Sequence, residues 1–117
     1  MKRSVVMMSV GIAVVGLSSG MLPANAAVPK AATISAAKSP ADHEAIAKAY
    51  EAEAVSLEKM AAMHKNLGQT YGQPGGKPWQ SAQAKHCDSV ASDLEAAAKE
   101  ERALAAEHHK MATAAGQ

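Results

Sequence analysis

The sequence predicts an all-α protein: an antiparallel hairpin of two helices, completed to a four-helix bundle when two copies pair. Residues 39–112 are rich in Ala, Glu, Lys and Leu, which favour helices. Polar and apolar residues recur there at spacings of three, four and seven, which describe one face of an α-helix. A stretch rich in glycine and proline, residues 68–78, interrupts the pattern and cannot continue a helix.

The first 26 residues are typical of an export signal. Lys2 and Arg3 supply positive charge, residues 5–17 form an uncharged and almost wholly apolar run, and residues 24–26 read Ala-Asn-Ala. We therefore expect cleavage after residue 26 and a periplasmic location. An uncleaved membrane anchor is the alternative, against which several glycines and Pro23 argue.

Composition limits the partners of the remaining chain. Without Lys2 and Arg3, the twelve basic residues become ten against eleven acidic ones, so the formal charge is −1. That balance gives no electrostatic reason to bind nucleic acid or an anionic membrane. We expect neither a nucleic-acid partner nor stable membrane association after signal cleavage.

The helical hairpin is expected between a flexible leader, residues 27–38, and a frayed tail, residues 113–117. Ser39 is a typical N-cap, Pro40 suits the first helical position, and Asp42 suits the positive end of a helix. The first helix is expected over residues 40–67, with Gly68 just beyond its end. The loop covers residues 68–78, and the second helix about 79–111.

Each predicted helix has a stripe of residues that should face its neighbour. The first stripe repeats every seven residues, and the second alternates steps of three and four. The two stripes are His43, Tyr50, Leu57 and His64, and then Cys87, Val90, Leu94, Ala97, Glu101, Leu104, His108 and Met111. Setting Leu57 opposite Leu94 brings metal-ligand types together near both ends of the hairpin. It also places Tyr50 beside Glu101, where a hydrogen bond would satisfy both.

The predicted cluster near the loop contains imidazole, thiol and thioether groups from four residues: Met60, His64, His86 and Cys87. Such soft ligands favour Cu(I), with zinc as the alternative. The methionines could equally be core fillers. Cys87, the only cysteine, could be a ligand, a buried inert residue, or half of a disulfide between two copies.

A second predicted cluster lies at the opposite end and contains His43, His108 and Met111, with His109 nearby. Neutral imidazoles there could bind copper or zinc. The alternative is that His108 and His109 only complete a helix end, where positive charge is favoured.

These patterns predict an exported homodimer that binds a soft transition metal, copper before zinc, for buffering or transfer. The alternative is an envelope protein that presents its helices to an unknown protein partner, in a structural or chaperone-like role, without metal. A Cys87–His64 pair lacks a third orienting group, so we expect no enzyme.

The segments DHEAIAKAYEAEA, MAAMH, KHC and LEAAAKEERALAAEHHKMA carry a family resemblance. The chain resembles small exported, alanine-rich bacterial proteins of helical-hairpin type, most of them without an assigned activity. The matching positions are Asp42, His43 and Glu44, then His108, Met111 and Ala112. The resemblance covers most of residues 41–112 and implies export and a helical hairpin.

Overall fold

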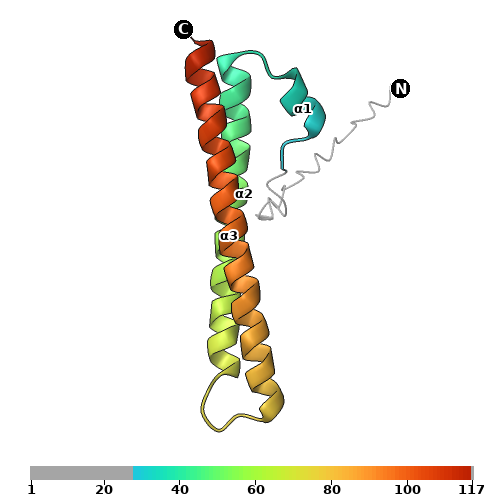
Figure 1. Cartoon of the computed structure of the whole chain (residues 1–117), viewed down its shortest axis with the longest axis vertical. Helices are drawn as coiled ribbons and strands as arrows, with labels where there is room; N and C mark the ends of the chain where they lie inside the picture. Colours follow the sequence, from blue (N-terminus) through green and yellow to red (C-terminus); the bar gives the residue numbers. More distant parts are fainter. Residues whose placement is uncertain (1–27, 117) are drawn as a thin grey trace, which may run out of the picture.

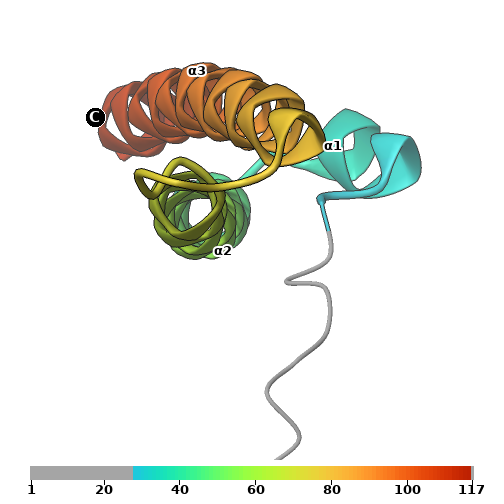
Figure 2. The same cartoon turned by 90° about the horizontal axis from the view of Figure 1, so that it is seen from below.

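The computed structural model describes residues 28–116, and within that range all regular structure is helical. The helices are α1 (Ala31–Ala36), α2 (Pro40–Tyr71) and α3 (Pro78–Ala115). The two long helices lie side by side and antiparallel, with α1 beside them (Figures 1 and 2). The predicted all-α hairpin is confirmed. The predicted export signal, residues 1–26, lies outside the described residues, as do residues 27 and 117.

α2 begins where the sequence offers a complete set of start signals. Ser39 is the N-cap, and its Oγ accepts a 3.1 Å hydrogen bond from the backbone N–H of Asp42. In return, Asp42 Oδ2 accepts hydrogen bonds from the backbone N–H groups of Ser39, at 3.0 Å, and Lys38, at 3.1 Å. This reciprocal capping box satisfies N–H groups that the first turn leaves free.

α2 ends four residues later than the predicted Leu67, because Gly68 does not stop it. Gly68 is buried against α3, where an added Cβ would lie 2.5 Å from Asp88 Oδ1 and 3.5 Å from the Ala84 carbonyl oxygen. Gly68 therefore lies where α2 and α3 approach each other closely. Gly72 is the C-cap instead, and its N–H donates to the Gly68 carbonyl at 2.9 Å.

The connecting loop is therefore shorter than predicted, spanning residues 72–77 rather than 68–78. Gly75 has a φ of +83°, which glycine adopts without the steric cost of a side chain. α3 begins at Pro78 and continues past the predicted end at Met111 to Ala115. Most of the expected tail is thus helical, because alanine and threonine there leave the helix uninterrupted up to Gly116.

The predicted flexible leader contains the short helix α1. Ile34 and Ala37 pack against a small core at the open end of the hairpin, where α2 begins and α3 ends. That core consists of Ile46, Ala47, Tyr50 and Ala105. Ile34 is the one large apolar residue of α1, so its burial explains why this segment docks.

Two rows of side chains form the seam between α2 and α3, each repeating every seven residues. The first, which we call the small-residue row, contains Ala47, Ala54, Ala61 and Gly68 of α2 and Ala84, Ala91, Ala98 and Ala105 of α3. The second, the mixed row, contains His43, Tyr50, Leu57 and His64 of α2 and Cys87, Leu94, Glu101 and His108 of α3. All but Ala84 of the small-residue row are buried, whereas the mixed row is buried or half-buried.

Half of the stripe predicted for the second helix is wrong. Its members Val90, Ala97, Leu104 and Met111 are exposed, and the alanines of the small-residue row take their place in the seam. Large apolar side chains usually mark a core, but alanine lets two helix backbones approach closely. In this hairpin, close approach replaces the burial of bulky side chains.

The register also differs from the predicted one. Gly72 lies against Ala84 near the loop, and Gly116 lies against Pro40 at the open end. In both contacts the two residue numbers add to 156, whereas the predicted pairs add to 151. At a rise of 1.5 Å per residue, this offset of five residues is about 7.5 Å along the helices. In the mixed row the predicted pairing of His43 with His108 is nevertheless present, and His108 also lies beside Tyr50.

Candidate functional site

The histidines of the mixed row meet at the open end of the hairpin. His43 Nδ1 and His108 Nδ1 are 3.2 Å apart, and the two ring centroids are 5.4 Å apart. The Tyr50 ring lies 5.8 Å from that of His108, centroid to centroid. His108 is buried, with 7% of its surface exposed, and His43 is half-buried. Two imidazole nitrogens from different helices thus share one small, mostly apolar layer.

The surroundings of His108 favour its neutral imidazole. Burial lowers the pKa of His108 below its usual value of 6.5, and the nearby His43 lowers it further. Neutral imidazole has one nitrogen without a proton, which is the form that binds metals. In the absence of metal, one Nδ1 can donate its proton to the other, so the pair is also satisfied as a hydrogen bond.

The spacing of the two nitrogens suits a tetrahedral metal ion. Metal–nitrogen bonds of about 2.0–2.1 Å at a tetrahedral angle place two nitrogens about 3.3 Å apart. The observed 3.2 Å between His43 Nδ1 and His108 Nδ1 is close to that edge length. Met111 lies three residues after His108, on the flank of the same helix, and is exposed. Its flexible thioether is the soft donor nearest to the pair along the chain.

His109 is not a free ligand, because both of its ring nitrogens are occupied. Nδ1 lies 2.8 Å from Glu44 Oε2, and Nε2 lies 2.9 Å from Glu51 Oε1. Hydrogen bonds to Glu51 and Glu44 raise the pKa of His109 above 6.5, because the imidazolium donates from both nitrogens. His109 therefore joins α3 to α2. The seven-residue spacing of Glu44, Glu51 and Glu58 is the sequence signal that could have revealed this row of acceptors.

The predicted cluster near the loop is not gathered in the same way. Met60 and His86 are exposed, while His64 and Cys87 are half-buried on facing helices. Within residues 28–116, His64 Nδ1 is shielded from solvent and has no hydrogen-bond partner. No group of three or more His, Cys, Asp or Glu side chains in the described part of the chain is placed to hold a metal ion.

Glu101 is a further polar residue in the seam. Its Oε2 is shielded from solvent and has no hydrogen-bond partner among the described residues. The predicted hydrogen bond between Tyr50 and Glu101 is not present among the described residues, where the Tyr50 ring lies beside His108. Burial raises the pKa of Glu101 above its usual 4.5, and the nearby charge of Glu53 raises it further.

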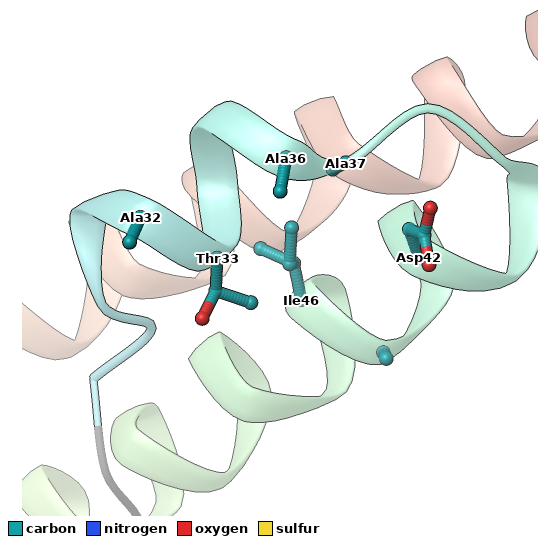
Figure 3. A pocket seen from close by; sticks show the side chains of 7 residues that line it. Ala32, Thr33, Ala36, Ala37, Asp42 and Ile46 are labelled. Carbon is teal, nitrogen blue, oxygen red and sulfur yellow. The ribbon is translucent and has the colours of Figure 1, made fainter.

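An open hollow of about 450 Å³ lies between α1 and the start of α2 (Figure 3). It is lined mostly by small apolar side chains: Ala32, Thr33, Ala36, Ala37, Asp42, Ala45 and Ile46. The carboxylate of Asp42 already accepts the capping hydrogen bonds of α2. The hollow therefore adds no metal-ligand group to the histidine pair.

Comparison with known proteins finds no match to a protein-family model, a curated protein or a solved structure. None of the described helices combines the length and apolarity needed to cross a membrane.

Proposed function

We propose that the protein binds one soft transition-metal ion, copper first and zinc as the alternative, at the open end of its helical hairpin. His43 and His108 would supply Nδ1 ligands, and Met111 would add a thioether. The observation that supports this most is the 3.2 Å separation of the two Nδ1 atoms in a largely apolar layer. Imidazole with thioether is a donor set that suits Cu(I).

His64 and Cys87 form a second and weaker candidate. The unpartnered Nδ1 of His64 is the observation in its favour, because buried polar atoms usually have a partner. A thiolate on the facing helix would be a matching soft ligand. Met60 and His86 would have to come from the surface to complete such a site.

In the cell, this protein would be exported to the periplasm and would buffer or transfer its metal there, without an enzymatic role. Two hairpins would pair to form a four-helix bundle, because a seam made of alanines buries little area for each residue. An interaction protein of the envelope is the second candidate function. The large apolar side chains exposed along α2 and α3 favour it.

A competition titration tests the metal site. The mature, reduced protein is titrated with Cu(I) against a chromogenic Cu(I) chelator under anaerobic conditions. We expect His43→Ala combined with His108→Ala to remove the tightest site, and His86→Ala, at an exposed histidine, to leave it intact. An unchanged titration for the double variant would reject the open-end site. If Cys87→Ala alone removes binding, the site lies near the loop instead.

A further inference from the structure

The two flanks of the seam differ in chemistry. On one flank, which we call the charged edge, α2 and α3 are joined by ion pairs: Lys65–Glu95, Glu58–Arg102, Glu44–His109 and Glu51–His109. The Glu58–Arg102 pair is bidentate, with N···O distances of 2.9 and 2.8 Å. Each of these pairs spans the two helices, so this flank is closed by contacts within one hairpin.

The opposite flank carries apolar residues at corresponding positions. A step of two residues along a helix turns about 200°, which leads from one flank to the other. Two residues beyond Glu58, Lys65 and Arg102 are Met60, Leu67 and Leu104, and the same step from Glu51 leads to one charged residue, Glu53. Ala97 lies two residues beyond Glu95, and Val90 lies seven residues before Ala97, on the same face of α3. Met60, Leu67, Val90 and Leu104 form what we call the apolar edge, and all four are exposed.

One helix already docks on this flank. Ile46 lies two residues beyond Glu44, so it continues the apolar edge toward the open end. Ile34 and Ala37 of the α1 segment pack around it. α1 is only six residues long, and among the described elements no other helix lies beside α2 and α3 between α1 and the loop (Figure 1).

We propose that a second copy of this chain covers the apolar edge, with α2 of each hairpin packed on α3 of the other. The apolar residues come from both helices, so the surface is self-complementary, as a two-fold dimer requires. The exposed acidic residues Asp93 and Glu100 flank the edge on α3, while on α2 the half-buried Glu53 lies within it. Packing α2 on α3 keeps these two acidic flanks apart, whereas packing α3 on α3 would bring them together.

The thin core gives an independent reason for self-association. No side chain in the described residues is both large and fully buried, and alanines make up most of the core. A chain of this size with so little apolar burial usually needs oligomerisation, a disulfide or a metal for stability. This inference deepens the dimer proposed above and does not depend on metal binding.

Two valines of nearly equal exposure provide a matched test. Val90, 39% exposed, lies on the apolar edge, and Val55, 40% exposed, lies near the charged edge. Sedimentation equilibrium of the mature chain is measured with chelator and reductant present. We expect the wild type and Val55→Lys to have twice the mass of one chain. We expect Val90→Lys to weaken the dimer by on the order of 100-fold, because the interface would bury an unpaired charge.

A second measurement covers the case in which Val90→Lys does not fold. Folding coupled to dimerisation makes the wild-type Tm rise with protein concentration. The proposal would be overturned if the wild type is monomeric at roughly 100 µM and its Tm does not depend on concentration. The Kd of any dimer would then exceed that concentration, which is too weak for a stable dimer. Equal effects of Val55→Lys and Val90→Lys would overturn it as well. Because chelator is present, neither result bears on the metal site.

Discussion

The two rows of the seam differ in what they contribute to the molecule. The small-residue row consists of alanines and Gly68, and it sets how closely α2 and α3 approach. The mixed row beside it holds His43, His64, Glu101 and His108, which are the polar groups of the interior. The comparison shows that the small residues of one row allow close packing of the backbones, while the row beside it can hold polar side chains between the helices. The small-residue row determines the fold, and the mixed row carries the candidate site.

The largest expected effect comes from enlarging the small-residue row. Ala98 is buried against α2, so Ala98→Leu should force the helices apart and destabilise the protein by about 1–3 kcal/mol. The matched control is Ala103→Leu, at an exposed position of the same helix, which should change stability by less than about 0.5 kcal/mol. Urea unfolding followed by circular dichroism measures both. Equal stability of the two variants would show that the row does not set the helix spacing.

A smaller effect of opposite sign is expected in the mixed row. Glu101 is half-buried and has a shielded, unpartnered Oε2, so Glu101→Leu should stabilise the protein at neutral pH by about 1 kcal/mol. The exposed neighbour gives the control, Glu100→Leu, for which we expect no such gain. If Glu101→Leu is destabilising, the carboxylate has a partner in the assembled protein.

The same substitution has a defined pH dependence. The pKa of Glu101 is raised in the folded state, so the ionised carboxylate costs stability above that pKa. As pH falls through the folded pKa toward the usual 4.5, the wild type recovers this stability. The advantage of Glu101→Leu over the wild type should therefore shrink as the solution becomes more acidic.

The smallest effect is expected at Gly68. Replacing a helix-interior glycine by alanine usually gains about 0.5–1 kcal/mol. The new Cβ would lie 2.5 Å from Asp88 Oδ1, but that atom ends a flexible side chain on the surface and can move. Gly68→Ala should thus change the free energy of unfolding by less than about 1 kcal/mol. A loss of several kcal/mol would mean that the helices approach more closely at the loop end than elsewhere.

Local signals in the sequence predicted the hairpin well. The Ser39–Pro40 start and the glycine- and proline-rich turn locate the two long helices, because caps and breakers act within a few residues. Gly68 misled the boundary, since its role depends on α3 rather than on its neighbours in sequence. α1 was missed for the same reason, because Ile34 packs against a small core whose residues are distant in sequence.

The candidate site was predicted only in part. The heptad spacing correctly suggested that His43 and His108 lie close together. The mixed row of α3 was predicted correctly, but the row beside it was not, because alanines occur on every side of these helices and hydrophobicity favours Val90 and Leu104. Whether a polar residue of the mixed row finds a partner depends on an offset of a few residues between the two helices, which sequence spacing does not resolve.

The central claim is that His43 and His108 bind one metal ion together. The most direct test follows the ¹⁵N resonances of the histidine rings by NMR while Cu(I) is added anaerobically to the reduced protein that lacks residues 1–26. We predict that the Nδ1 signals of His43 and His108 shift together during the first equivalent, while those of the exposed His86 do not. Binding of that equivalent with both Nδ1 signals unchanged would contradict the account.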